Sequence, residues 1–418
     1  MNSVPKKTSS IRTWLHYLKH LHSQPISLGL ERVKNVGAAL DLLTSSSLVF
    51  TVSGTNGKGT TCRALEIMLL AEGYTVGVYN SPHLMHYTER VRIQGDELTD
   101  IAHIEAFSEV ETGRSSTPLT YFEFSTLSAL WLFKKESLDV LILEVGLGGR
   151  LDATNIINAD VAVVTNIALD HTIWLGTDCE KIGREKAGIF RRGKPAIIGD
   201  PHSPQSIKDV AIETGALLQQ CNSSWSYKVA TDSWSFYDSH GRLENLSLPK
   251  IPINNAATAL AALRSSPLYV DETNIRLSLH QASLPGRFQI ISEEPRVILD
   301  VAHNPHAAQY LSTRLIKIKN QSQIHAVVGM RNDKDISGTF SCLIHNIDYW
   351  YCASLEGSYG STAKQLVSYL DQAKDFPSVE LAWIDALKNT EKKDIILVFG
   401  SFHTVSQVIK KINQCKIK

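Results

Sequence analysis

Residues 48–61 read LVFTVSGTNGKGTT, a short apolar strand pattern that runs into a glycine-rich turn. Residues 61–73 then show the apolar spacing of a helix and end at a glycine. In this setting glycines let backbone N–H groups approach phosphates, and the helix N-terminus favours negative charge. Lys58 would neutralise the β- and γ-phosphates. The stretch therefore predicts a phosphate-binding loop, although Val52 stands where the strict pattern has glycine and Gly59 displaces the hydroxyl by one position.

Apolar strand patterns alternate with helical patterns on both sides of this loop. Further strands are expected at 75–80, 138–145, 161–167 and 194–199, with helices at 122–137 and 254–266. Such alternation favours a parallel sheet covered by helices on both faces. The pattern loosens over 221–250 and restarts after Pro285-Gly286, with strands expected at 297–303, 324–330, 348–354 and 394–401.

The expected fold class is therefore α/β with two domains. Residues 1–286 would form a P-loop-type ATP-binding domain, and residues 287–418 a smaller Rossmann-like domain.

Composition narrows the class of protein. Lysine plus arginine equal aspartate plus glutamate at 42 each, so the basic excess typical of nucleic-acid and anionic-membrane binders is missing. No segment approaches the roughly 20 apolar residues that span a bilayer. The 6 cysteines show no close pair or metal-type spacing. These features favour a reduced, cytoplasmic enzyme without a nucleic-acid or membrane partner.

For three further residues the sequence allows either a role in the site or an ordinary structural role. Glu144 ends an apolar strand, where a carboxylate suits Mg²⁺ but is equally a solvated charge. His171 follows another strand, yet imidazole is an uncommon Mg²⁺ ligand and a lone histidine is more often structural. Lys186, beside Glu185, reads by itself as part of a surface salt pair at a helix end.

Taken together, these segments resemble the folylpolyglutamate synthase and dihydrofolate synthase family, which is related to the Mur ligases. The matching stretches occur in family order: ISLGLERV (26–33), SGTNGKGTT (53–61), YNSPHL (79–84), ERVRI (89–93), EVGLGGRLDATN (144–155), LDH (169–171), REKAGIFRRGKP (184–195), NAATALAAL (255–263), LPGRFQ (284–289), DVAHNP (300–305) and GSFHTV (400–405).

The resemblance implies an ATP- and Mg²⁺-dependent amide ligase with two Mg²⁺ sites. ATP would phosphorylate a substrate carboxylate, and the amino group of L-glutamate would attack the acyl phosphate. TYFEFSTL (120–127) and LDAT (151–154) resemble the bifunctional members, which make dihydrofolate from dihydropteroate and extend folates to polyglutamates. A monomer is the family expectation.

The resemblance also implies roles for individual positions. Catalytic roles fall on Lys58, Lys186 and His303. ATP binding falls on Thr55, Asn56, Gly57, Lys58, Gly59, Thr60, Asn255, Arg287 and Asp300. Metal binding falls on Ser81, Glu144, His171 and Lys186, the last as a carbamate. Dihydropteroate binding falls on Ile26, Ser27, Leu28, Thr120, Tyr121, Phe122, Glu123, Leu151, Asp152 and Ala153. The incoming glutamate would meet His303 and Ser401.

Two rival functions remain at this stage. A Mur-type ligase with a UDP-muramoyl substrate usually carries an extra amino-terminal domain, whereas the loop here begins at residue 53. Lys250-Ile251 also replaces the His-Asn pair of those enzymes, which favours the folate branch. A phosphate-loop NTPase switch would need no second domain with an Asp-x-x-His-Asn strand end.

Overall fold

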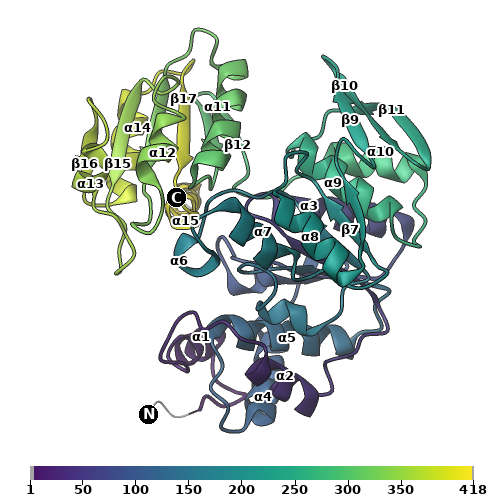
Figure 1. Ribbon diagram of the computed structural model, residues 1–418. Helices are drawn as coiled ribbons and strands as arrows, with labels where there is room; N and C mark the ends of the chain where they lie inside the picture. Colours follow the sequence, from purple (N-terminus) through teal and green to yellow (C-terminus); the bar gives the residue numbers. More distant parts are fainter. Residues whose placement is uncertain (1–3, 417–418) are drawn as a thin grey trace. The chain divides into compact units, whose positions relative to one another are not determined.

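The computed structural model describes residues 4–416, drawn in Figure 1. The chain divides into two compact units between Ser283 and Leu284, whereas the sequence predicts the division after residue 286. No helix in the described part of the chain is both long and apolar enough to cross a membrane.

The N-terminal unit is built on an eight-stranded sheet of order β4-β3-β2-β5-β1-β6-β7-β8. Its strands are β1 (Leu48–Ser53), β2 (Val76–Tyr79), β3 (Val91–Ile93), β4 (Asp96–Glu97), β5 (Val140–Glu144), β6 (Val161–Val164), β7 (Pro195–Ile198) and β8 (Leu217–Gln220). β2, β5, β1, β6, β7 and β8 run parallel, and β3 and β4 add an antiparallel edge. Because β1 lies between β5 and β6, the segments that follow these three strands meet at one edge of the sheet.

Helices cover both faces of this sheet. One face carries α3 (Lys58–Glu72), α9 (Ile253–Arg264) and α10 (Glu272–Gln281). The opposite face carries α1 (Ile11–Lys19), α2 (Glu31–Ala39), α4 (Asp100–Arg114), α5 (Tyr121–Lys135), α7 (Cys179–Ala187) and α8 (Gln205–Thr214). The strands serve both faces by alternation: in β1, Phe50 and Val52 pack under α3, while Val49 packs with the helices opposite.

A small antiparallel sheet occupies the region in which the sequence shows no clear period. It comprises β9 (Ser226–Val229), β10 (Ser233–Asp238) and β11 (Gly241–Ser247). Trp234 and Phe236 alternate inward, but the register shifts between them, and the buried residues of β11, Leu243 and Leu246, are three positions apart. This irregularity breaks the two-residue period that identifies a strand in sequence.

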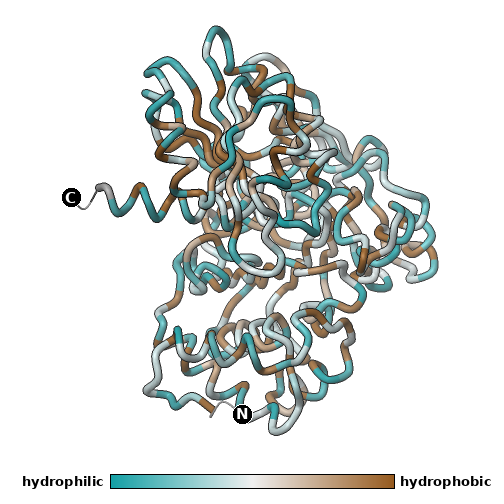
Figure 2. The backbone as a smooth tube through the Cα atoms, turned by 90° about the vertical axis from the view of Figure 1, so that its left-hand side faces the viewer, coloured by the Kyte–Doolittle hydropathy of each residue, from teal (hydrophilic) through white to brown (hydrophobic). Residues whose placement is uncertain are grey.

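The C-terminal unit has a six-stranded sheet of order β12-β13-β17-β14-β15-β16. The strands are β12 (Gln289–Glu293), β13 (Arg296–Leu299), β14 (Ile324–Val328), β15 (Tyr349–Ala353), β16 (Lys374–Phe376) and β17 (Ile395–Phe399), all parallel except β12. The helices are α11 (Pro305–Lys319), α12 (Ile336–Ser341), α13 (Ala363–Val367), α14 (Val379–Asn389) and α15 (Phe402–Lys416). Helix α15 alternates hydrophilic and hydrophobic residues (Figure 2), and its Val405 and Val408 are fully buried.

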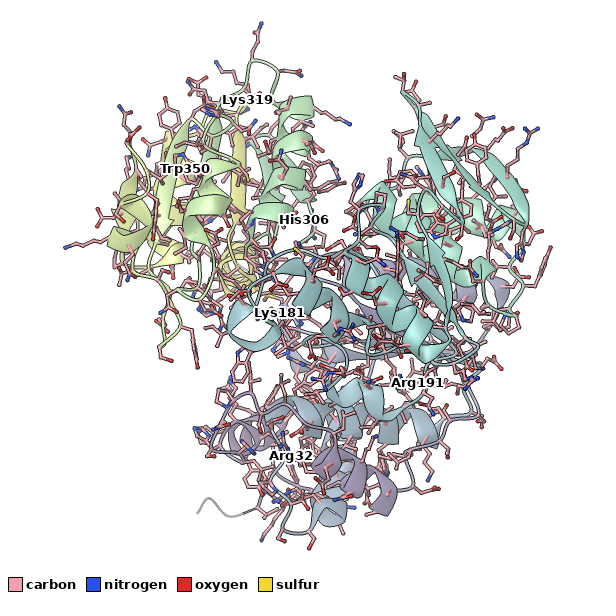
Figure 3. All side chains as sticks on the ribbon, in the orientation of Figure 1. Arg32, Lys181, Arg191, His306, Lys319 and Trp350 are labelled. Carbon is pink, nitrogen blue, oxygen red and sulfur yellow. The ribbon has the colours of Figure 1, made fainter. Side chains whose placement is uncertain are left out.

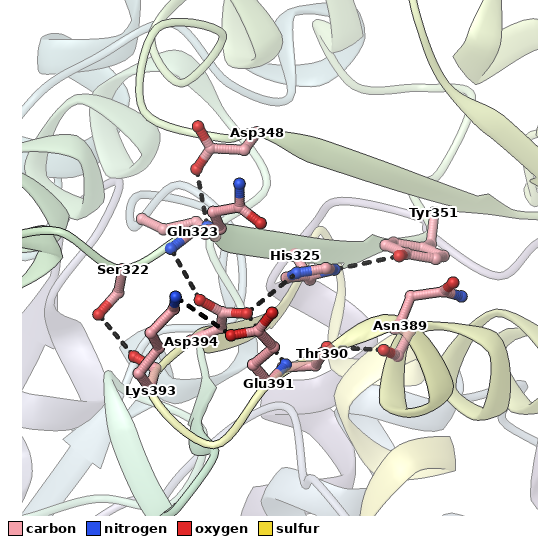
Figure 4. Close-up of polar contacts among 12 residues, drawn as sticks. Ser322, Gln323, His325, Asp348, Tyr351, Asn389, Thr390, Glu391, Lys393 and Asp394 are labelled. Carbon is pink, nitrogen blue, oxygen red and sulfur yellow. Dashed lines mark hydrogen bonds and ion pairs between the residues drawn. The ribbon is translucent and has the colours of Figure 1, made fainter.

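A buried polar cluster lies at the start of β14 and β17 in this unit (Figure 4). The ring of His325 stacks on Tyr349, its Nδ1 lies 3.0 Å from the hydroxyl oxygen of Tyr351, and its Nε2 lies 3.8 Å from Oδ2 of Asp394. Burial is the largest influence on the imidazole and lowers the pKa of His325, although the nearby Asp394 opposes this.

Candidate active site

The glycine-rich loop between β1 and α3 has a backbone that only glycine fits at two positions. Gly54 has φ +144°, and a Cβ there would lie 1.8 Å from the hydroxyl oxygen of Thr165. Gly57 has φ +83°, and a Cβ there would lie 2.4 Å from Oδ1 of Asn255. The loop is therefore pressed against its neighbours so closely that any side chain would displace them.

The segment after β6 holds this loop in place. The backbone N–H of Thr55 donates to the carbonyl of Asn166 (3.0 Å), and that of Asn56 donates to Oδ1 of the same asparagine (3.0 Å). The Thr165 hydroxyl donates to the carbonyl of Asn56 at 2.6 Å. Since both partners follow the strand next to β1, the sheet itself sets the shape of the loop.

Helix α3 begins directly at Lys58, so the N-terminus of the helix faces the loop. The Lys58 ammonium donates to the carbonyls of Gly54 (3.0 Å) and Thr55 (3.3 Å). From α9, the Asn255 amide donates to the Thr60 hydroxyl at 2.8 Å, which ties a second helix to the first turn of α3. Gly59 lies half-buried in that turn.

Lys186 is buried beneath the loop, in contrast to the surface position that its sequence context indicates. Its Nζ donates to the carbonyl of Gly54 at 2.8 Å, and the residue is 4% exposed. The neighbouring Glu185 instead pairs with Arg150. Burial, reinforced by the positive charge of Lys58, holds the pKa of Lys186 well below the ordinary lysine value. The site therefore favours a neutral amine.

Glu144 and Ser81 lie side by side at the ends of β5 and β2. The backbone N–H of Ser81 donates to Oε2 of Glu144 at 3.0 Å, and the Asn80 amide donates to the same oxygen at 2.9 Å. Glu144 is 5% exposed and forms no ion pair with any described residue. A buried carboxylate whose neighbouring residue carries a hydroxyl offers hard oxygen donors, which fit a divalent cation such as Mg²⁺.

His171 differs from Glu144 and Lys186 in its exposure to solvent. It is exposed and precedes the short helix α6 (Thr172–Leu175), with φ +52°. Across residues 4–416 no three His, Cys, Asp or Glu side chains gather as a metal-binding group. A cation held here would accordingly rely on ligands outside that set, such as Ser81 or a modified lysine.

Asp152 organises the glycine-rich segment after β5. Its Oδ2 accepts from the backbone N–H of Leu147 (2.8 Å), and its Oδ1 accepts from the N–H (3.0 Å) and hydroxyl (2.7 Å) of Thr154. It caps a 3-10 helix, η2 (Ala153–Ile156). Burial raises the pKa of Asp152 to about 6 despite these hydrogen bonds.

The other predicted dihydropteroate residues form two linked segments. Glu123 and Thr120 make a capping box at the start of α5. Arg32, on α2 and labelled in Figure 3, pairs with Glu123 at 2.8 Å and also donates to the carbonyl of Ser27. Phe122 lies against Gly146, where a Cβ would come within 2.5 Å of its ring. The half-buried members of these segments are Ile26, Ser27, Leu28, Tyr121 and Leu151, and Ala153 is buried.

Four candidate residues belong to the C-terminal unit. Asp300, after β13, accepts from the backbone N–H groups of Phe288 (2.7 Å) and Ala302 (2.8 Å), and burial raises its pKa, opposed by the positive charge of Arg287. Nδ1 of His303 lies 2.8 Å from the carbonyl of Val301.

Ser401 precedes α15, where its hydroxyl accepts from the N–H of Thr404 at 3.0 Å. β13 and β17 are parallel neighbours, so the segments carrying His303 and Ser401 leave the sheet at the same edge.

The sequence reasoning missed several residues that hold this site together. Arg32, Asn80 and Arg92 lie within the motifs that resemble the family, and Glu66 and Asn166 lie outside them. For Arg92 the sequence offers a partial signal. An arginine on a strand of a buried sheet needs a carboxylate partner, but the sequence does not say which carboxylate that is.

Comparison with known proteins agrees with this arrangement. Residues 52–263 match the Mur ligase middle domain, and residues 286–402 match the Mur ligase glutamate ligase domain. The chain belongs to the Mur ligase family. The resemblance and the two-domain α/β class drawn from the sequence are thereby confirmed.

Individual relatives place the chain in the folate branch of the Mur ligase family. It is 59% identical over 98% of its length to the dihydrofolate synthase/folylpolyglutamate synthase of Escherichia coli strain K12, covering 97% of that protein. A solved structure of E. coli FolC in complex with DHPP and ADP matches with a TM-score of 0.97 and 58% identity, covering 99% of this chain and 100% of the other. A bifunctional folylpolyglutamate synthase/dihydrofolate synthase with Mn, AMPPNP and L-glutamate bound matches with a TM-score of 0.95 and 55% identity, covering 98% and 100%.

Proposed function

We propose that this Mur ligase family member joins L-glutamate to dihydropteroate to form dihydrofolate, and adds further glutamates to folates, through an acyl phosphate made from ATP. The observation that carries the proposal is the convergence on Gly54, where Lys58 and Lys186 both donate to one loop carbonyl. The Lys58 ammonium beside a helix N-terminus suits the negative charge that gathers on a phosphoryl group in transfer. The buried Lys186, on the same carbonyl, is the residue proposed to carry the carbamate. The relatives named for both activities support the same reaction.

The N-terminal unit would hold ATP through residues 55–60 and Asn255. The family resemblance also gives nucleotide roles to Arg287 and Asp300, which belong to the C-terminal unit. Lys58 would neutralise phosphate charge as the substrate carboxylate attacks. His303 and Ser401 would receive the glutamate end. A relative solved with L-glutamate bound supports glutamate as the amine substrate.

A divalent cation would be held by Glu144 and Ser81, with His171 nearby. When bound, Mg²⁺ supplies neutralisation of phosphate charge. A relative solved with Mn and AMPPNP supports a divalent metal beside the nucleotide. A second Mg²⁺ would lie beside Lys186, which would carry a carbamate. The lowered pKa of Lys186 favours this modification, because the neutral amine is the form that combines with carbon dioxide and releases a proton.

The pterin ring would contact residues 26–28, 120–123 and 151–153. These segments are mutually braced by Arg32 and by the packing of Phe122 on Gly146. Bracing matters because a substrate must be positioned to within about 1 Å for efficient reaction. Five of the six cysteines, at positions 62, 179, 221, 342 and 352, have free thiols in the described part of the chain, which supports the proposal of a reducing, cytoplasmic setting.

The test is to incubate the protein with ATP, Mg²⁺, L-glutamate and dihydropteroate and to measure dihydrofolate, ADP and phosphate. Equal amounts of the three products support the proposal, and Lys58→Ala should lower the rate by about 10²- to 10³-fold in a folded protein. ATP hydrolysis that ignores glutamate and dihydropteroate would instead indicate an NTPase switch. Turnover only with a UDP-linked acceptor would indicate the cell-wall branch.

A further inference from the structure

A buried ion-pair network is connected to Glu144 through one intervening residue, Asn80. Glu66, on α3, is fully buried. Arg92, on β3, donates to both carboxylate oxygens of Glu66: Nε donates to Oε1 at 2.9 Å and Nη2 to Oε2 at 2.7 Å. Arg63 donates to Oε2 as well, at 2.9 Å. The guanidinium of Arg92 is therefore fixed in both position and plane by a carboxylate that cannot move into solvent.

Asn80 connects this pair to Glu144. Nη2 of Arg92 donates to Oδ1 of Asn80 at 2.9 Å, and Nδ2 of Asn80 donates to Oε2 of Glu144 at 2.9 Å. A guanidinium has only donors, so it selects the oxygen side of the asparagine amide. The nitrogen side must then face Glu144, where an acceptor is required. Arg92 thus dictates which way the amide of Asn80 points.

The network has a directional effect on Glu144. Oε2 receives both the Asn80 amide and the backbone N–H of Ser81, whereas no described residue donates to Oε1. The carboxylate is therefore fixed through Oε2, which leaves Oε1 available to a cation.

We infer that Glu66, Arg92 and Asn80 form a positioning relay that aims the Glu144 carboxylate at a divalent cation, an inference that rests on the metal role given to Glu144 in the proposed function. Arg92 and Asn80 are positioning residues and touch neither substrate nor metal. Outer partners of this kind typically change metal affinity by about 10- to 100-fold when they are altered.

Stability alone does not account for the arrangement. A buried ion pair is often replaceable by apolar residues without loss of stability, because desolvation of two charges offsets their attraction. The pair in this chain is moreover linked through Asn80, whose amide nitrogen donates to Glu144. A purely structural Glu66–Arg92 pair would need no such link.

The test compares Arg92→Lys and Asn80→Leu with a matched control. Lysine keeps a positive charge for Glu66 but lacks the planar fork that reaches Glu66 and Asn80 together. Asn80→Leu removes the amide while leaving Glu66 with both arginines. The control is Arg264→Lys, because Arg264 makes a two-bond, largely buried pair with Asp238 (2.6 and 2.9 Å) that has no link to Glu144.

The readout is Mn²⁺ affinity, measured from the electron paramagnetic resonance signal of free Mn²⁺ with AMPPNP at a fixed saturating concentration. Arg92→Lys and Asn80→Leu should raise the Mn²⁺ Kd by about 10- to 100-fold. The Mg²⁺ concentration for half-maximal ligation should rise equally, and kcat should recover at high Mg²⁺. Arg264→Lys should lower Tm without changing the Mn²⁺ Kd.

Glu144→Gln separates failure of this inference from failure of the proposed function. If Glu144→Gln weakens Mn²⁺ binding but folded Asn80→Leu does not, the relay is wrong and the metal role stands. If Glu144→Gln also leaves the Mn²⁺ Kd unchanged, the metal role and the relay both fall. Should Arg92→Lys fail to fold, Asn80→Leu decides alone.

Discussion

Replacing Gly57 with alanine should damage both the fold and the nucleotide site, by an amount that follows from the geometry of the loop. Gly57 has φ +83°, a region that costs an L-residue roughly 1–2 kcal/mol. The added Cβ would lie 2.4 Å from Oδ1 and 2.6 Å from Nδ2 of Asn255. Asn255 is only 4% exposed, so it must move and lose its bond to Thr60.

Leaving those buried polar groups unpaired costs about 1–3 kcal/mol. The total expected loss in the free energy of unfolding is therefore about 2–5 kcal/mol. Since Asn255 is proposed to contact ATP, its displacement should also weaken ADP binding by at least about tenfold, equivalent to roughly 1.4 kcal/mol.

Gly73→Ala is the matched control at the other end of the same helix. Gly73 has φ +97°, but a Cβ there would meet no atom within 4 Å. This variant should lose only the backbone term of about 1–2 kcal/mol and bind ADP normally. Equilibrium urea unfolding and calorimetric ADP titration measure the two effects. Equal stability losses in the two variants, with normal ADP binding by Gly57→Ala, would refute the reasoning.

Three other changes have defined outcomes. Lys186→Met should abolish ligation yet raise Tm at neutral pH, because burial and Lys58 lower the pKa of this amine in the fold, so that the unfolded chain binds a proton more readily. A lower Tm would contradict this, and activity restored to Lys186→Met by a small carboxylic acid would support the carbamate. Asp152→Ala should raise KM for dihydropteroate by about tenfold or more through roughly 1–3 kcal/mol of lost hydrogen bonding, with KM for ATP unchanged; equal loss of both would assign the residue to the nucleotide site or the fold. The lowered pKa of His325 means that the unfolded state gains a proton first as the pH falls through about 6.5, so β14 should become less stable in acid. Amide hydrogen exchange in β14 between pH 7.5 and 5.5 should show this loss, and His325→Phe should remove it if the histidine is the cause.

The parts of the site that are local in sequence were predictable. Gly57, Lys58 and the start of α3 are neighbours in the chain, so one short pattern predicts both the glycine-rich loop and the helix that follows it. Strands such as 48–53 were equally accessible, because they are buried on both faces and read as continuous apolar runs.

The parts that depend on distant contacts were not predictable from local pattern. Lys186 reads as a surface residue beside Glu185, yet its Nζ bonds to the carbonyl of Gly54, 132 positions away. The strands β9–β11 were not predicted, because a register shift disrupts the alternation of buried residues that identifies a strand in sequence. The partnership of Arg92 with Glu66 likewise joins a strand to a helix 26 positions away, which no local period encodes.

Helix α3 joins the phosphate loop to the buried Glu66. The loop meets the helix at its first residue, and Glu66 lies roughly 12 Å further along the helix axis, at 1.5 Å per residue. A packed helix moves as a unit, so a displacement at its N-terminus is also a displacement of the anchor for Glu144. Nucleotide and cation should then be thermodynamically coupled: the factor by which ATP tightens cation binding equals the factor by which the cation tightens ATP binding. Variants that cut the connection at Asn80 should reduce both factors together, even where either ligand alone still binds.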